Sequence, residues 1–201
     1  MPNLDRIALV VALSLALPAR SHADDTPPSS APRRVVELGA SSVLAFGLLP
    51  AASLGPSLEV TLRWLDASLS VEARVLRALG RDPNAASILG PESTAGLGLM
   101  SICRHDEAVF VCASFQTGVV AADVEGDLKS TDDGKLSWMV TSGLRGGAAW
   151  RLVRHLELRS FLELHTVLER PHVRVDSVER WRASYVAGII GVGLSFRLNP
   201  E

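Results

Sequence analysis

Hydrophobic and polar residues alternate with a period of two along most of the chain. The clearest stretch is residues 150–170, WRLVRHLELRSFLELHTVLER, whose leucines stand at 152, 156, 158, 162, 164 and 168. On a helix these leucines would scatter around the axis, whereas on a strand they share one face. The opposite face carries mainly charged residues, so this segment is predicted to be a strand with a leucine side and a charged side.

The same alternation recurs along the rest of the chain, and no amphipathic helix is needed to account for it. We predict an all-β fold of eight strands, at residues 35–47, 58–65, 68–79, 93–103, 109–122, 136–150, 155–170 and 185–198. Counted from these limits, the connections hold 10, 2, 13, 5, 13, 4 and 14 residues. Long and short connections therefore alternate, and both ends of the predicted sheet lie on the short side.

This rhythm favours an eight-stranded antiparallel up-and-down transmembrane β-barrel. Barrels of the outer membrane combine short periplasmic turns with longer outer loops, and a tilted strand crosses the hydrocarbon in about 9–11 residues. A soluble secreted barrel of the lipocalin kind has no physical reason to keep the alternation and is the second interpretation. A transmembrane helix over residues 38–58 is a weaker alternative, because Pro50 and Pro56 would break it.

The first residues indicate export. Arg6 precedes an apolar run from Ile7 to Leu17, and Ser21 and Ala23 are small residues of the type that a signal peptidase reads. We expect residues 1–23 to be a signal peptide, 24–34 a Pro-rich periplasmic linker, 35–198 the barrel and 199–201 a C-terminal tail. The apolar run is too short to span a bilayer as a helix.

Composition narrows the remaining classes of function. The chain is 47% hydrophobic with a formal net charge of -2, so it has no basic excess for nucleic acid, and no nucleic-acid partner is expected. The two cysteines, Cys103 and Cys112, lack metal-ligand spacing. An even count in an exported chain predicts one disulfide at the periplasmic end. Neither a metal site nor a cofactor site is predicted.

If the leucines face lipid, the inward-facing positions carry equal numbers of acids and bases. They are Glu37, Glu59, Glu72, Glu157, Glu163, Arg63, Arg74, Arg145, Arg159 and Arg197. An eight-stranded barrel is just wide enough for side chains to fill it, and buried charges are costly unless they pair. We therefore predict an interior charge network and no wide diffusion pore, with a narrow ion path left open.

Aromatic residues and the last strand point to the same membrane. Trp138 and Trp150 share the apolar face twelve residues apart, and with Trp64 they are predicted to form aromatic girdles. Gly193, Phe196 and Leu198 are similar to the C-terminal signal of outer-membrane barrels, although Leu198 stands where Phe is commonest.

The chain thus resembles small outer-membrane β-barrels of the OmpA and OmpX kind over about residues 35–198. The Cys103/Cys112 spacing, the following Phe115-Gln116-Thr117-Gly118 and the late Glu169-Arg170-Pro171 resemble a group of such barrels from GC-rich Gram-negative bacteria. The resemblance implies an outer-membrane location, contact with the barrel-assembly machinery and with lipid, and a monomeric state. It implies no activity.

Two further functions have candidate residues in the sequence. A lipid-modifying enzyme would need an acid, a His and a Ser in contact, for which Glu163, His165 and Ser184 are candidates, and nothing in their spacing demands that contact. We therefore expect no enzyme. The acidic connection 123–135 and the connection 173–184, with Arg174, Arg180, Trp181 and Arg182, could contact divalent cations or lipopolysaccharide. A structural or surface-interaction barrel is the preferred interpretation.

Overall fold

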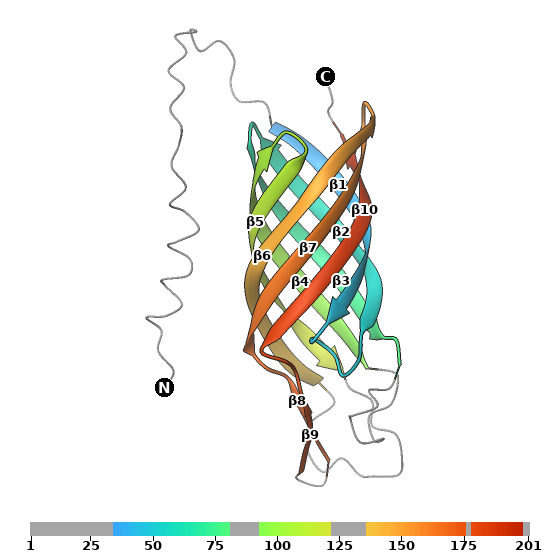
Figure 1. Cartoon of the computed structure of the whole chain (residues 1–201), viewed down its shortest axis with the longest axis vertical. Helices are drawn as coiled ribbons and strands as arrows, with labels where there is room; N and C mark the ends of the chain where they lie inside the picture. The colour runs from blue at the N-terminus through green and yellow to red at the C-terminus, as the bar shows by residue number, and fades with distance from the viewer. Residues whose placement is uncertain (1–33, 81–92, 122–135, 176–177, 199–201) are drawn as a thin grey trace, which may run out of the picture. The chain divides into compact units, whose positions relative to one another are not determined.

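The computed structural model describes residues 34–80, 93–121, 136–175 and 178–198 (Figure 1). The expected signal peptide, nearly all of the expected linker, the acidic connection 123–135 and the tail 199–201 lie outside these residues. The strands are β1 Arg34–Phe46, β2 Ser53–Trp64, β3 Ala67–Ala78, β4 Thr94–Asp106, β5 Val109–Ala121, β6 Leu136–Val153, β7 Leu156–Glu169, β8 His172–Val175, β9 Val178–Arg182 and β10 Val186–Arg197. In the described part of the chain, no helix is long and apolar enough to cross a membrane.

Eight of these strands close into a barrel in the order β1-β10-β7-β6-β5-β4-β3-β2, while β8 and β9 form a separate two-stranded sheet. Each barrel strand pairs antiparallel with both neighbours. The last strand meets the first from Glu37↔Arg197 to Phe46↔Gly188, and the Leu198 amide donates to the Val36 carbonyl at 2.9 Å. The predicted eight-stranded antiparallel up-and-down barrel is confirmed.

The two ends of the barrel differ in how the strands are connected. At one end, called the turn end, the strands are joined by the two-residue turns 65–66, 107–108 and 154–155, and β1 starts and β10 ends there (Figure 1). The other end, called the loop end, carries the connections 47–52, 79–93, 122–135 and 170–185.

Two turns are shorter than predicted. Five residues were expected at 104–108 and four at 151–154, because the pairs that actually turn, Glu107-Ala108 and Arg154-His155, lack the Gly and Asn that mark two-residue hairpins. Glu107 nevertheless adopts the left-handed region, with φ 49°, as does Leu65 in the first turn, with φ 51°. Strands β4 and β6 therefore extend to Asp106 and Val153.

Strand β2 begins five residues before its predicted start, so the prediction that Pro56 lies in a connection is wrong. Pro56 stands inside β2 opposite Ser42 of β1, and the ladder to β3 skips Gly55 and Pro56 before resuming at Ser57↔Arg74. A Cβ at Gly55 would lie 1.7 Å from the Val75 carbonyl oxygen. Because Gly55 has no side chain, the backbones of β2 and β3 can approach this closely. The close approach keeps β2 in the sheet at Pro56, which has no N–H to donate to the ladder.

Strands are present in two other segments, one weighed as a helix and the other expected to be a connection. Residues 38–58 form most of β1, a connection and the first half of β2, so the alternative of a transmembrane helix over this segment is wrong. The connection expected at 171–184 contains the hairpin β8–β9, which follows β7 and precedes β10. Its strands are only four and five residues long, too short for the alternation to be recognised in the sequence.

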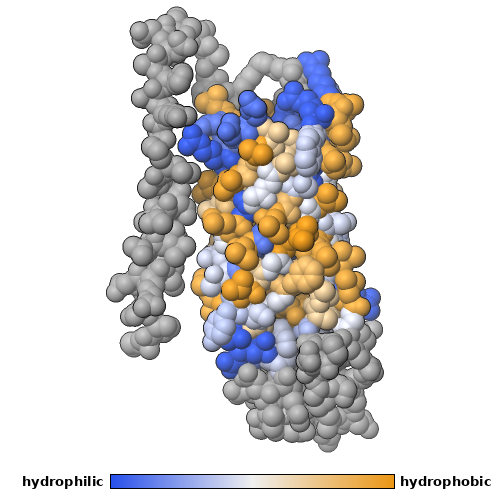
Figure 2. Space-filling model, in the orientation of Figure 1, coloured by the Kyte–Doolittle hydropathy of each residue, from blue (hydrophilic) through white to orange (hydrophobic). Residues whose placement is uncertain are grey.

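Burial along the strands is inverted relative to a soluble protein. Outward-facing Leu58, Leu162 and Leu164 are 66%, 61% and 62% exposed, while Glu37, Glu163 and Arg74 are buried. On the face in Figure 2, hydrophobic side chains cover the middle of the barrel and hydrophilic ones gather toward its turn end. Exposed apolar surface of this extent marks a face that meets lipid or protein.

Candidate functional site

Inward-facing charges along the barrel axis form the candidate site. The alternation of the strands places all ten charged residues singled out from the sequence on the inner wall, and each has an ion pair within 4.0 Å. They gather into two groups with Glu59 between them. The burial of these side chains requires such pairing, because an unpaired charge removed from water costs several kcal/mol.

The central ion cluster consists of Glu72, Arg74, Arg145 and Glu163. The Arg74 guanidinium donates to both oxygens of Glu163, at 2.8 and 2.6 Å, and its Nε donates to Glu72 at 2.5 Å. Arg145 donates to Glu163 at 2.7 Å and also to Glu72. Two carboxylates and two guanidiniums thus bridge β3, β6 and β7 across the barrel, and their charges balance.

One aromatic ring covers this cluster. The Arg145 guanidinium lies over the Phe161 ring, 4.5 Å from its centroid. The ring fits against β10 because Gly191 has no side chain: a Cβ there would stand 2.2 Å from the ring. Cation–π contact adds to the ion pairs and fixes the direction of the guanidinium.

His165 extends the cluster toward the loop end. Its Nε2 lies 2.9 Å from Glu163 Oε2 and its Nδ1 lies 3.1 Å from the Thr141 hydroxyl. The His and Thr side chains are buried, and Glu163 already accepts from two arginines. Ser184, the serine weighed for an enzyme, is exposed, and neither ring nitrogen of His165 bonds to it among the described contacts. The three candidate residues therefore do not form a catalytic triad.

The turn-end ion cluster consists of Glu37, Arg63, Glu157, Arg159 and Arg197. Glu37 accepts from Arg159, and from Arg197 at 3.0 Å. Glu157 lies 2.5 Å from Arg197 and 3.7 Å from Arg159. The Arg63 guanidinium is 3.7 Å from Glu37, beyond hydrogen-bond distance. This cluster ties β1, β2, β7 and β10 together where the barrel closes.

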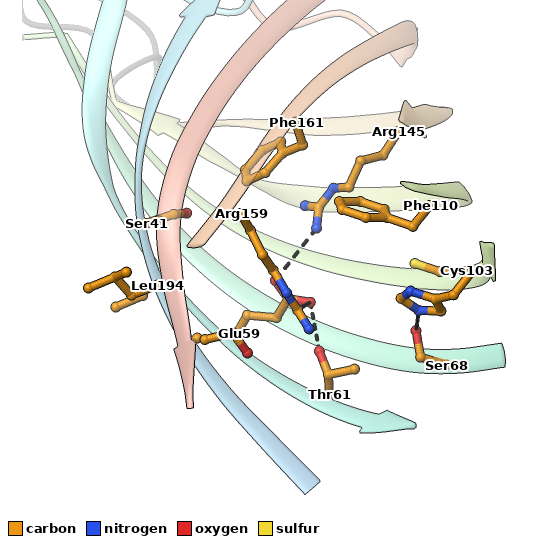
Figure 3. Close-up of a pocket in the computed structure, with 15 residues that line it drawn as sticks. Ser41, Glu59, Thr61, Ser68, Cys103, Phe110, Arg145, Arg159, Phe161 and Leu194 are labelled. Atoms are coloured by element: carbon orange, nitrogen blue, oxygen red, sulfur yellow. Dashed lines mark hydrogen bonds and ion pairs between the residues drawn. The ribbon is translucent and has the colours of Figure 1, made fainter. Parts of the chain in front are cut away.

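A cavity of about 30 Å³ separates the two clusters (Figure 3). Glu59 lies on its wall, where it accepts from Thr61 at 2.7 Å and stands 3.7 Å from Arg145 and 4.0 Å from Arg159. Ser68 bonds the His105 ring at 2.8 Å on the opposite side. The volume is enough for isolated water molecules and far below that of an aqueous channel.

Beyond the central ion cluster the interior becomes apolar. Leu48 of the connection 47–52, Leu76, Met139 and Ile189 are all fully buried. With further buried residues they form one apolar cluster, which includes Val43, Ala45, Leu97, Val120 and Ala187. This apolar layer was not predicted from the sequence, because the inward positions were assigned by their charges alone and Leu48 was placed in a loop.

Cys103 and Cys112 form a disulfide between β4 and β5 near the turn 107–108. The two cysteines stand directly opposite each other in the ladder. A covalent link therefore supplements the hydrogen bonds of one hairpin at the turn end.

The predicted girdle residues lie on the outer wall. Trp138 and Trp150 of β6 are 63% and 48% exposed, and Trp64 ends β2 at the turn end. In β10, Phe196 faces outward and Gly193 faces inward, with the Phe196 ring stacked on His155 at 5.9 Å. Leu198, directly after β10, is exposed. These positions are compatible with membrane contact and recognition of the last strand, which remain predictions.

Two further polar residues belong to the interior. His105, which the sequence places in a turn or an interior network, stands at an inward-facing position of β4 and bonds Ser68. Sequence reasoning did not single out Gln116, which is buried on β5 with its Oε1 3.5 Å from Arg74. The strand alternation could have identified Gln116, but its type of side chain alone did not.

No protein-family model matches the chain, and neither does any curated protein. The structure is similar to a crystal structure of Neisserial surface protein A (NspA), with a TM-score of 0.50 and 13% identity over 81% of this chain and 96% of that chain. Ail, the attachment invasion locus protein of Yersinia pestis, in complex with the heparin analogue sucrose octasulfate, gives 0.44 and 11% over 82% and 97%. The fold is that of small eight-stranded outer-membrane β-barrels, as predicted.

Proposed function

We propose that the chain is a small outer-membrane barrel with a structural or surface-interaction role, and that it is neither a wide pore nor an enzyme. The inversion of polarity supports this proposal: exposed leucines cover the outside and paired charges fill the inside. A soluble barrel of the lipocalin kind would expose its charged face instead. Export by the N-terminal signal and the aromatic positions of β6 agree with an outer-membrane location.

The filled interior supports the proposal that the barrel is not a wide pore. Along the axis, the turn-end ion cluster, the central ion cluster and the apolar layer follow one another, and the cavity between the two clusters is about 30 Å³. Solute passage would require these side chains to move and the ion pairs of Glu163 to separate. These features support the proposal that the barrel is not a wide diffusion pore.

Because side chains fill the interior, a surface role falls to the connections at the loop end. The connection 170–185 includes the β8–β9 hairpin. At its base, Arg170 donates to the Ala183 carbonyl at 2.6 Å and lies over the Tyr185 ring at 3.7 Å. Arg beside an exposed Tyr suits the membrane interface, where lipopolysaccharide phosphates are expected partners. The monomeric state is part of the same proposal.

Three experiments test the proposed function. Cell fractionation should recover the full-length chain in the detergent-soluble outer membrane, whereas recovery in the soluble periplasm would overturn the proposal. Reconstitution into a planar lipid bilayer should give no large, ohmic conductance steps, and stable porin-sized steps would overturn the assignment against a wide pore. Lipid A mass spectrometry of a deletion strain should show no change, and an altered acyl or phosphate pattern would restore the enzyme alternative.

A further inference from the structure

A basin of about 450 Å³ opens at the turn end of the barrel. Its charged and ring-bearing lining residues are Arg63, His105, Glu107, Phe110, Trp150, Arg151, Glu157 and Arg197, of which Trp150 belongs to the outer wall at the rim. The volume falls within the range of about 300–1,000 Å³ that is usual for small-molecule sites. We call this space the turn-end basin.

Charge in the turn-end basin is unevenly matched. The adjoining turn-end ion cluster has three guanidiniums and two carboxylates, Glu37 and Glu157. Both carboxylates are already held closely by other arginines: Glu37 by Arg159 and Arg197, and Glu157 by Arg197. The ten inner charges balance only when Glu59 is counted, and Glu59 lies 3.7 Å from Arg145 and 4.0 Å from Arg159 and does not line the basin. The basin lining itself carries Arg63, Arg151 and Arg197 against Glu107 and Glu157, so one positive charge is left over there.

Arg63 carries this surplus. Among the described residues, only Glu37 lies within ion-pair distance of Arg63, at 3.7 Å, which is too long for a hydrogen bond. The Arg63 side chain is 19% exposed and lines the basin. A guanidinium offers five N–H donors in a planar fork. Arg63 therefore has N–H donors available for a ligand in the basin.

The rim of the basin adds hydrogen-bond donors and one charge of each sign. Arg151 is 64% exposed and 4.0 Å from Glu157, and His105 is held by Ser68 at 2.8 Å. Glu107, in the turn 107–108, also lines the basin and contributes one negative charge. Counting Arg151 and Glu107 as one charge of each sign, the surplus from Arg63 is preserved.

We propose that the turn-end basin binds a small soluble oxyanion, such as inorganic phosphate, with Arg63 as its principal ligand and Arg151 as a second. Guanidiniums bind phosphate and carboxylate oxygens through short, charge-assisted hydrogen bonds. Arg63, Glu157 and Arg197 belong to the inner wall and are only 19%, 7% and 17% exposed, which favours a soluble anion over a lipid headgroup on the outer wall. The inference rests on the barrel fold and does not depend on the proposed cellular role.

The test uses the chain without the expected signal peptide, folded in uncharged detergent micelles. Inorganic phosphate is followed by the line width of its ³¹P resonance, with chloride replacing phosphate to keep ionic strength constant. Saturable broadening is expected, with an affinity reduced roughly tenfold or more in Arg63→Gln, because charge-assisted hydrogen bonds are lost. Arg104→Gln is the matched control. Arg104 lies in β4 near the turn end, is 61% exposed and does not line the basin.

Each outcome decides the proposal. Absence of saturable broadening in the unmodified chain overturns it, and so does equal affinity in Arg63→Gln and the unmodified chain. Equal weakening by Arg104→Gln would indicate a diffuse charge effect and would also overturn it. If Arg63→Gln fails to fold by circular dichroism, Arg63→Lys keeps the charge without the planar fork, and its affinity must then fall below that of the unmodified chain.

Discussion

Replacing Leu162 by Arg tests whether the leucine face of the barrel meets lipid. Leu162 stands near the middle of β7, opposite Gly146 of β6 and Ile190 of β10, and its side chain is 61% exposed on the outer wall. The same substitution at Leu168, on the same face one residue before the end of β7, provides the matched control. The two variants carry the same chemical change at different depths.

The expected magnitude follows from the position of Leu162 along the barrel. Six residues separate it from Leu168, which corresponds to about 15 Å along the membrane normal at about 3.3 Å per residue and a tilt near 40°. The apolar band of such barrels is about 25 Å tall, so Leu162 lies near its centre and Leu168 near its edge. Leu162→Arg should lower the free energy of unfolding by about 2–4 kcal/mol, and Leu168→Arg by about 0–1 kcal/mol.

Equilibrium unfolding in urea, with the barrel in phosphatidylcholine vesicles and tryptophan fluorescence as the signal, measures both values. Leu162→Ala separates the loss of leucine surface from the burial of charge. Equal, small effects of Arg at the two positions would refute the assignment of this face to lipid. A large effect at Leu168 with none at Leu162 would place the apolar band at a different height.

Three further substitutions test the interior, the disulfide and assembly. Glu163→Gln should lower the free energy of unfolding by about 3 kcal/mol, because two buried arginines lose a shared partner, while Glu107→Gln in an exposed turn should change it by at most about 0.5 kcal/mol. Replacing Cys103 and Cys112 by Ser should cost roughly 2–3 kcal/mol and leave a folded barrel. Phe196→Ala should lower outer-membrane yield without lowering export across the inner membrane, as measured by fractionation.

Specific results would contradict each expectation. Equal stability of the Glu163 and Glu107 variants in urea would mean that the central ion cluster adds nothing to stability. Free thiols at both cysteines, found by peptide mapping of outer-membrane protein without reductant, would contradict the disulfide. An unchanged amount of Phe196→Ala in the outer membrane would remove the role assigned to the last strand.

The alternation of side chains was sufficient to predict the eight barrel strands and the two faces of the barrel, because a strand turns every second residue to the same side. It did not predict the short strands β8 and β9, because the pattern needs several residues to be recognised. It could not predict which charges meet. Arg74 and Glu163 are 89 residues apart in the chain, and their contact depends on the register of strands that are not neighbours in the barrel. The shortness of the turns 107–108 and 154–155 and the passage of β2 through Pro56 also escaped prediction, since both depend on backbone geometry that the types of side chain do not indicate.

The inner wall changes character along the barrel, and this limits where a surface function can lie. In β3, the inward positions run from Ser70 through Glu72 and Arg74 to Leu76, so the polar interior ends at an apolar layer toward the loop end. Opening a water path through that layer would expose buried apolar side chains and separate paired charges. The polar interior is therefore reached more easily from the turn end, through the turn-end basin. Recognition at the loop end then has to use the connections themselves, which can vary without disturbing the ion pairs that hold the barrel together.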